Sequence, residues 1–295
     1  IGDKDQGGNW ELNASATPRA AVPFSEEVRD AFGVVLQTFT IQGVKDDQPA
    51  GSYNVEDTAS NLLAEESNNG SATDSVLGGA DSIATSDGSA VSLSVLEYTT
   101  LTDTLSATIT NGYDLSDTAA NLAGAAPSTV TGAGTVTATT TDGEDLTSLD
   151  LSSVDTIAVS DGDAVTTTVA QASLVSTSGN GTFAVEDSVT NLTGDQGDLS
   201  AATSVVVKLA DNGTDADLSG VTLDDDVDGI DLNGQAATLT VAQAGLTITT
   251  SGGSLSVEDT ASNLAGYADG DGATSVTATT TDGEDLTSLD LSSVD

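Results

Sequence analysis

Turns with closely spaced carboxylates are the part of this sequence with the clearest chemical potential. Five glycine-containing turns carry two to four acids each. Ca²⁺ binds through oxygen ligands, and neighbouring Asp side chains in such turns supply several of them, with backbone carbonyls completing the shell. We therefore predict Ca²⁺ at one or more of these turns, with a solvated acidic surface as the alternative. The candidate ligands are Asp142, Glu144, Asp145, Asp161, Asp163, Asp224, Asp225, Asp226, Asp228, Asp269, Asp271, Asp282, Glu284 and Asp285.

The acidic turns do not follow an established calcium motif. An EF-hand loop needs a Glu at its end, and none of the turns supplies it in place. The Gly- and Asp-containing nonapeptide of calcium-binding β-helix repeats is absent as well. The calcium prediction therefore depends on local carboxylate density alone.

Enzymatic chemistry has little support in the composition. The chain has no Cys, His or Met, which removes the nucleophilic thiol, the imidazole base and the usual nitrogen and sulfur metal ligands. Glycoside hydrolysis needs only two carboxylates. Sugar clefts usually carry aromatic platforms, however, and residues 51–295 have only four Tyr and one Phe. We predict that the protein is not an enzyme.

The charge balance excludes two classes of partner. Asp and Glu number 47 against five Lys and Arg, which gives a formal charge of −42. Nucleic acids and anionic membranes both attract basic surfaces, so neither is an expected partner. No run of apolar residues is long enough for membrane insertion. Repulsion of this size predicts that folding relies on high ionic strength or bound cations.

Internal repetition organises residues 51–295. A motif of the kind "VEDTASNL" occurs four times, with its central Asp at positions 57, 117, 187 and 259. A second motif, "TIAVSDGDAVTTTVAQA" at 156–172, has relatives that begin at 82 and 229. A third, "VTATTTDGEDLTSLDLSSVD", occupies 136–155 and returns without change at 276–295. The repeat length is about 70 residues, and such a period is typical of stacked repeat proteins.

Short β-branched segments with Gly, Asn or Asp between them predict the fold. Each repeat divides into three segments of roughly one solenoid coil each, and helical periodicity is nearly absent. We expect an all-β fold, a repetitive parallel β-helix (solenoid) with about three coils per repeat. The alternative is a string of antiparallel β-sandwich modules.

Local motif chemistry favours structural roles over ligand sites. In "VEDTASNL" the Asp or Thr is suited to cap a short helical turn whose Leu faces inward, and the Asn is expected to form a ladder between coils. In "TVAQA" we expect Gln171 and Gln243 to satisfy backbone groups.

The first fifty residues differ from the rest. They hold four of the five basic residues, together with the only Trp and three of the four Phe. We predict that residues 1–50 form either a cap on the first coil or an assembly segment that docks on the acidic body of another copy in a head-to-tail homopolymer. The candidate assembly residues are Trp10, Phe24, Phe32 and Phe39. We expect the repeat region to continue beyond residue 295, which is a boundary rather than a natural cap.

The stretches "SDGDAVTTTVAQA" (160–172) and "VEDTASNLAG" (257–266) carry a resemblance to known proteins. Residues 51–295 resemble the Thr-, Ala- and Asp-rich repeats of bacterial surface proteins, including giant adhesins, S-layer-like proteins and RTX-type secreted proteins. The resemblance implies secretion, a cell-surface or extracellular location, Ca²⁺-dependent folding and a structural or adhesive function.

These observations together predict an extracellular structural protein that self-assembles into a filament, surface layer or appendage. The alternative is the stalk or binding region of a monomeric cell-surface adhesin, with cell-surface polysaccharide as a further possible partner.

Overall fold

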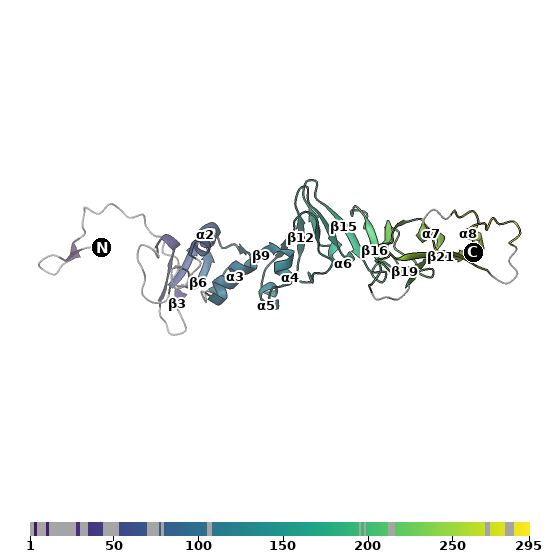
Figure 1. The fold of residues 1–295 in the computed structure, drawn as a ribbon. Helices are drawn as coiled ribbons and strands as arrows, with labels where there is room; N and C mark the ends of the chain where they lie inside the picture. Colours follow the sequence, from purple (N-terminus) through teal and green to yellow (C-terminus); the bar gives the residue numbers. More distant parts are fainter. Residues whose placement is uncertain are drawn as a thin grey trace. The chain divides into compact units, whose positions relative to one another are not determined.

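The computed structural model describes residues 3–4, 10–11, 28–29, 35–43, 53–69, 77, 80–104, 108–194, 196–197, 199–211, 216–268, 272–280 and 286–295 (Figure 1). The chain divides into two compact units. The first comprises residues 1–115 and 132–134, and the second comprises 116–131 and 135–295. The boundary therefore falls within strand β9 (Tyr113–Thr118), and the boundary expected at residue 50 stays a prediction.

The first unit contains a five-stranded sheet in the order β3-β4-β5-β6-β8. The β3–β4 pair is antiparallel, and the other pairs are parallel. Strand β7 pairs in parallel with β9, at one end of a five-stranded sheet in the order β14-β12-β10-β9-β7. The strands of this unit are β1 (Asp3–Lys4), β2 (Trp10–Glu11), β3 (Val28–Arg29), β4 (Val35–Phe39), β5 (Tyr53–Asp57), β6 (Ala80–Thr85), β7 (Val91–Leu93) and β8 (Thr108–Ile109). Its helices are α2 (Ala59–Asn69), α3 (Val95–Thr99) and the π-helix η2 (Thr100–Thr104).

The second unit is built from parallel strands that lie in three sheets. Strands β10, β12 and β14 share one sheet, while β11, β13, β15, β16, β18 and β20 form another and β17, β19, β21 and β22 the third. From β10 to β15 the chain visits the first two sheets alternately, so each strand pairs with one that lies about 20 residues away. The strands are β10 (Val136–Thr139), β11 (Glu144–Asp145), β12 (Thr156–Val159), β13 (Ala164–Thr167), β14 (Val175–Thr177), β15 (Thr182–Asp187), β16 (Val205–Lys208), β17 (Ala216–Asp217), β18 (Gly229–Asp231), β19 (Ala236–Leu239), β20 (Thr247–Thr249), β21 (Ser254–Thr260) and β22 (Ser275–Thr279).

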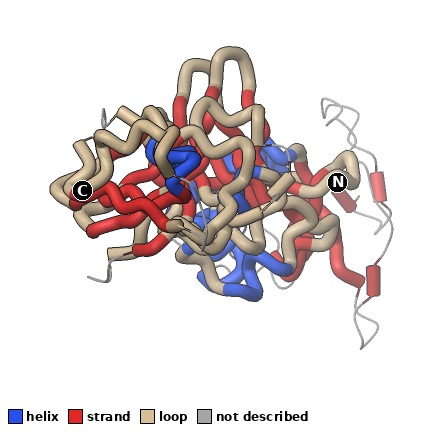
Figure 2. The backbone as a smooth tube through the Cα atoms, turned by 90° about the vertical axis from the view of Figure 1, so that its right-hand side faces the viewer, coloured by secondary structure: helices blue, strands red, loops and turns tan. Residues whose placement is uncertain are grey.

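Short helices lie between these strands (Figure 2). They are α4 (Ala119–Ala123), α5 (Pro127–Thr131), α6 (Val169–Ala172), α7 (Val241–Ala244) and α8 (Ala261–Leu264). Helices α4, α6, α7 and α8 each begin after a Thr whose hydroxyl accepts the N–H three residues later, which satisfies one of the unpaired donors of a first helical turn. Leu122 and Leu264 are buried, so the predicted capped turn with an inward Leu is confirmed.

The predicted fold class is wrong. The structure is a mixed α/β arrangement with four parallel sheets, in which helices account for 19% and strands for 35%, and it is not an all-β parallel β-helix or solenoid. Helices of four or five residues span too few turns for helical periodicity to be visible in a sequence, so the pattern alone assigns them to turns. The antiparallel β-sandwich alternative is also wrong, because the strands of the second unit pair in parallel throughout its described residues.

The core consists of aliphatic side chains from alternate strand positions. In β12, for example, Ile157 and Val159 are buried, whereas Thr156 and Ala158 are half-buried. This alternation follows from the period of two of a β-strand. The absence of large aromatic side chains from most of this core allows neighbouring segments to approach closely. In the described part of the chain, no helix is long and apolar enough to cross a membrane.

Candidate functional site

The Asp of the "VEDTASNL" motif organises the end of each strand that carries it. In β15, Asp187 Oδ1 accepts the N–H of Ser188 at 2.7 Å and the amide of Asn191 at 2.8 Å. The same Asn-to-Asp bond, 2.7–2.8 Å long, recurs in all four copies, so each Asn is paired within its own turn rather than with an Asn of another repeat. These side chains fix the strand-to-helix corner.

The second oxygen of the same Asp connects consecutive segments. Asp187 Oδ2 accepts the N–H of Val169, the first residue of α6, at 3.0 Å. Asp259 bonds in the same way to Val241, the first residue of α7. Each carboxylate thereby satisfies an unpaired N–H of a first helical turn that lies 18 residues earlier. The repeated Asp is therefore a structural connector.

The Gln of the "VAQA" motif also connects to an earlier segment, but as a donor to backbone carbonyls. Gln171 Nε2 donates to the carbonyls of Leu146 and Leu149 at 2.9 and 3.1 Å, while its Oε1 accepts the N–H of Thr168. Gln243 repeats the pattern with Leu218 and Val221. Both Gln side chains are buried. The prediction that these residues satisfy backbone groups is confirmed.

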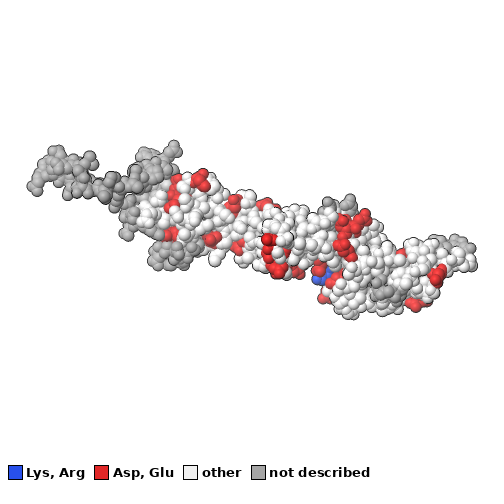
Figure 3. Space-filling model, turned by 90° about the horizontal axis from the view of Figure 1, so that it is seen from above, with Lys and Arg blue, Asp and Glu red and all other residues white. Residues whose placement is uncertain are grey.

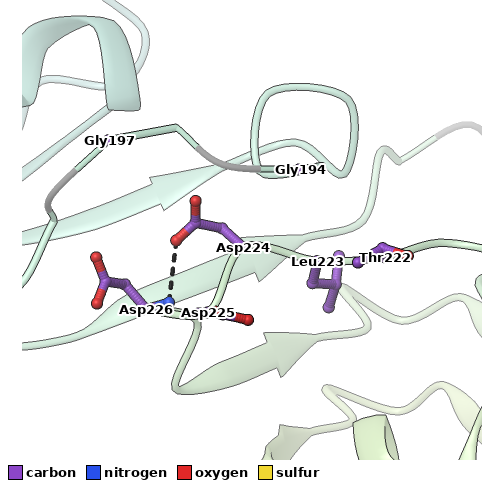
Figure 4. A pocket seen from close by; sticks show the side chains of 7 residues that line it. All are labelled: Gly194, Gly197, Thr222, Leu223, Asp224, Asp225 and Asp226. Carbon is purple, nitrogen blue, oxygen red and sulfur yellow. Dashed lines mark hydrogen bonds between the residues drawn. The ribbon is translucent and has the colours of Figure 1, made fainter.

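The acidic turn at 224–228 borders a cavity of about 280 Å³ (Figure 4). Asp224 is buried there, and its two oxygens accept the N–H groups of Gln196 and Asp226 at 2.6 and 3.0 Å. Asp226 Oδ2 accepts the N–H of Leu199 at 2.8 Å, and Asp228 Oδ2 accepts that of Val205 at 2.9 Å. The cavity is lined by Gly194, Gly197, Thr222, Leu223, Asp224, Asp225 and Asp226.

This geometry uses the carboxylates to hold the segment 196–205 in place. Three of the four acids each point an oxygen at a backbone N–H from 23 to 28 residues earlier in the chain, and Asp225 is exposed. An oxygen that accepts an N–H has less lone-pair capacity for a cation. Among the described residues, no group of three or more Asp or Glu side chains is placed to hold a metal ion. The Ca²⁺ prediction gains no coordination geometry from these residues and stays a prediction.

Four of the other predicted ligands also accept backbone N–H groups through their side chains. Asp142 Oδ1 accepts from Ala164, Glu144 Oε2 from Thr141, and Asp161 Oδ1 from Asn180. Hydrogen bonds from the hydroxyl and the N–H of Thr147 hold the pKa of Asp145 below its ordinary value. Asp163 lies in the turn between β12 and β13. The remaining candidates, which lie outside the described residues, are Asp269, Asp271, Asp282, Glu284 and Asp285.

The predicted assembly residues are only partly placed. Trp10 lies in β2, and Phe39 lies at the end of β4. The ring of Phe39 packs edge-on against Tyr53, with 6.2 Å between ring centroids, so it contacts its own unit. Phe24 and Phe32 lie outside the described residues.

Lys208, which belongs to no repeated motif, forms an ion pair in the folded chain. It is the one base in residues 51–295. Its ammonium group lies 2.7 Å from Glu186 Oε1, and Asp231 pairs with it in the β16–β18 register. The hydrogen bond to Glu186 is the largest cause of a raised Lys208 pKa, and the charges of Asp231 and Asp145 act in the same direction. A single cation among 39 acids is the signal that could have found it. On the face shown in Figure 3, Asp and Glu side chains form separate red patches, and one small blue patch of basic side chains lies among them.

Comparison of the chain with known protein families, curated proteins and solved structures finds no match.

Proposed function

We propose that the protein is an extracellular structural protein that self-assembles into a filament, surface layer or appendage. One observation carries the proposal: the repeated polar side chains join one segment to the next. Asp187 and Asp259 connect strand ends to earlier helices, and Gln171 and Gln243 connect helices to earlier turns. In repeat proteins each unit contacts mainly its neighbours, so connectors that recur from segment to segment are compatible with an architectural role.

The extracellular part of the proposal is supported by composition and by the resemblance to bacterial surface repeats. A highly acidic chain without Cys suits a saline medium, where counterions screen the repulsion between carboxylates. Ca²⁺ enters the proposal as a neutralising cation, since the described acids bond mainly to backbone N–H groups. It would lower repulsion within one copy and between copies.

Contact between copies is proposed to use residues 1–50. Four bases lie in this segment, whereas residues 51–295 hold 39 acids and one base. Opposite charges on the two contacting surfaces raise the association rate of two copies, and contact between two acidic surfaces is disfavoured.

Sedimentation velocity of the full chain over a range of concentrations tests the proposal, with electron microscopy of the same samples. We expect concentration-dependent oligomers in saline buffer, and more of them in millimolar Ca²⁺ than in EGTA. Trp10 is the only Trp, so a blue shift of its emission during assembly would report burial of the N-terminal segment. Substitution of Arg19 and Arg29 by Glu should weaken assembly, and Lys208→Glu serves as the charge control outside that segment.

A chain that stays monomeric at every concentration, with unchanged Trp10 emission, would contradict self-assembly. That result would favour the stalk or binding region of a monomeric adhesin.

A further inference from the structure

Three Asn-Gly pairs lie in bends or turns of the described chain, at 111–112, 180–181 and 233–234. Two further pairs, at 69–70 and 212–213, include residues outside the described ones. Asn is a thermally labile residue, because the backbone nitrogen that follows it can attack its side-chain amide. Glycine favours this attack, since no Cβ shields its nitrogen. The three described pairs share one dipeptide sequence, so differences in their reactivity that vanish on unfolding come from the folded structure.

Hydrogen bonds and close packing hold the pair Asn180–Gly181 in place. The N–H and the side-chain amide of Asn180 both donate to Asp161 Oδ1, at 2.6 and 3.1 Å. The N–H of Gly181, whose nitrogen would attack, donates to the Ser178 carbonyl at 2.9 Å. A Cβ on Gly181 would lie 2.6 Å from the Ser160 carbonyl oxygen, so the backbone is tightly packed here. Attack at this pair requires these contacts to break.

The pair Asn233–Gly234 is held in a similar way. Asn233 Nδ2 donates to the Leu209 carbonyl at 3.0 Å, and its N–H donates to Asp231 Oδ1 at 2.9 Å. The Gly234 N–H donates to the Thr250 carbonyl at 3.3 Å. Asn233 is also half-buried. In this pair, too, both the amide that would be attacked and the nitrogen that would attack it are engaged in hydrogen bonds.

The pair Asn111–Gly112 differs, because neither of its reacting groups is held. It lies between β8 and β9, and both residues are exposed. Among the described residues, neither Asn111 Nδ2 nor the Gly112 N–H has a hydrogen-bond acceptor. A Cβ on Gly112 would meet no atom within 4 Å, so the space around this backbone is open. The Thr110 hydroxyl lies 3.3 Å from Asn111 Oδ1, where its hydrogen bond polarises the amide carbonyl for attack.

We propose that Asn111 is a self-modification site, which converts to aspartate and isoaspartate in the folded chain while Asn180 and Asn233 are protected. The Gly112 nitrogen attacks Asn111 Cγ and forms a succinimide ring. The Cγ–Nδ2 bond breaks, and Nδ2 leaves as ammonia with the proton of the Gly112 nitrogen. Water then opens the ring, either at Cγ, which leaves Asp, or at the main-chain carbonyl, which leaves an isoaspartyl link through Cγ. Water is the only co-reactant. The inference goes beyond the proposed function and does not depend on self-assembly.

The test is a time course of the full chain in mildly alkaline buffer, once folded and once in concentrated guanidinium chloride. It continues until half of the Asn-Gly pairs in the denatured chain have reacted. Cleavage after Glu separates the three sites into the peptides 98–144, 145–186 and 187–258, and mass spectrometry measures the exchange of NH₂ for OH at each Asn. We expect folding to change the rate at Asn111 by no more than about threefold. Folding should slow Asn180 and Asn233 at least about tenfold, which is about 1.4 kcal/mol of added barrier.

Matched variants test the structural reason for the difference. Asp161→Ala removes the acceptor of Asn180 and should speed the reaction at Asn180 at least about threefold, without changing the rate at Asn111. Asn111→Gln should abolish the reaction in the peptide 98–144. Asn121 lies in the same peptide and donates to Asp117, so it is an internal reference that should stay unmodified. Circular dichroism checks that each variant keeps the fold.

The rates and the product both allow the inference to fail. Equal rates at the three sites of the folded chain would overturn it, and so would a reaction at Asn111 that stops on folding. The isoaspartyl link adds one carbon to the main chain just before β9. The Val91 N–H donates to the Gly112 carbonyl at 3.3 Å, so it should exchange faster in the isoaspartate fraction. Unchanged exchange at Val91 would overturn this structural consequence of the modification.

Discussion

The segments 136–155 and 276–295 allow sequence and environment to be separated within one molecule. Their Asp-to-Val bonds match to within 0.1 Å, yet Leu146 is inaccessible while Leu286 is half-buried. Over the residues described in both segments, the shared sequence therefore forms the same bonds, whereas the status of a side chain as core or surface depends on the segment that lies against it. Each copy of this repeat therefore has the same apolar positions, whichever segment lies against it.

The strongest test of this comparison truncates the same Leu in both segments. Leu146→Ala should lower the free energy of unfolding by about 2–5 kcal/mol, because it leaves a cavity in a fully packed site. Leu286→Ala should cost about 1 kcal/mol or less, since its side chain already contacts water and the site can relax. Urea unfolding followed by circular dichroism measures both. Equal losses would mean that the exposure of the second segment does not weaken its packing.

A second test weakens the contact between helix α6 and the segment 136–155. Gln171→Ala deletes the two hydrogen bonds to the carbonyls of Leu146 and Leu149 and a third from the Thr168 N–H, and should cost about 1–3 kcal/mol. Hydrogen exchange at 146–154 should then rise toward the rate at 286–294. Gln243→Ala is the matched control, because it removes the same bonds from Leu218 and Val221 and should leave exchange at 146–154 unchanged. Unaltered exchange in Gln171→Ala would show that α6 does not protect the backbone N–H groups of residues 146–154.

A third test addresses the shared local bond. Asp155→Ala removes the acceptor of the Val136 N–H and should cost about 1 kcal/mol, the usual net value of a hydrogen bond. Asp295→Ala removes the equivalent acceptor of Val276 and should have a smaller effect on global unfolding, since its surroundings are more exposed. In both variants the freed N–H should exchange faster. If only the first N–H responded, the two bonds would not be equivalent in solution.

The sequence predicts those parts of the structure that depend on neighbours close in the chain. Thr168 caps α6 and Leu122 faces inward because capping and helical spacing act over three or four residues. The backbone role of Gln171 was also predictable, because a lone amide in an apolar "VAQA" segment needs partners when it is buried. The fold class was not predictable in the same way. It depends on which strands pair with one another across about 20 residues, and the alternation within one strand does not identify its partner.

The candidate site shows the same limit. The pattern of Asp224 to Asp228 indicates carboxylate density, but it does not reveal that N–H groups from 196–205 would occupy their oxygens. Those contacts span 23 to 28 residues and arise only once the segments lie together. Lys208 gave no motif at all, although it meets Glu186 in the folded chain. A high density of acidic residues in the sequence predicts the chemistry that they could support. The hydrogen-bond partners of their carboxylates are determined by the tertiary structure.

The smallest expected effect tests whether charge contributes to the difference between the two segments. The charge of Lys208 helps to lower the pKa of Asp145, which belongs to the first segment, although the hydrogen bonds of Thr147 are the larger cause. The Lys208 side chain is 41% exposed and that of Glu186 is 25% exposed, so the pair contributes modestly. Lys208→Gln should lower the free energy of unfolding by no more than about 1 kcal/mol at neutral pH.

The pH dependence of that loss identifies its origin. The folded-state pKa of Lys208 is raised above 10.5, so the folded chain holds this proton more tightly than the unfolded chain. Its contribution is therefore fully present below about pH 10 and is lost as the pH rises through the folded-state pKa. Burial also raises the pKa of Tyr113, but this residue is present in both proteins and cancels in the comparison. Thermal unfolding of wild type and Lys208→Gln between pH 7 and the alkaline limit should give curves that converge above pH 10.5. A constant offset would show that Lys208 acts through the packing of its methylene groups. The burial of the segment 136–155 would then result from apolar contact and backbone hydrogen bonding alone.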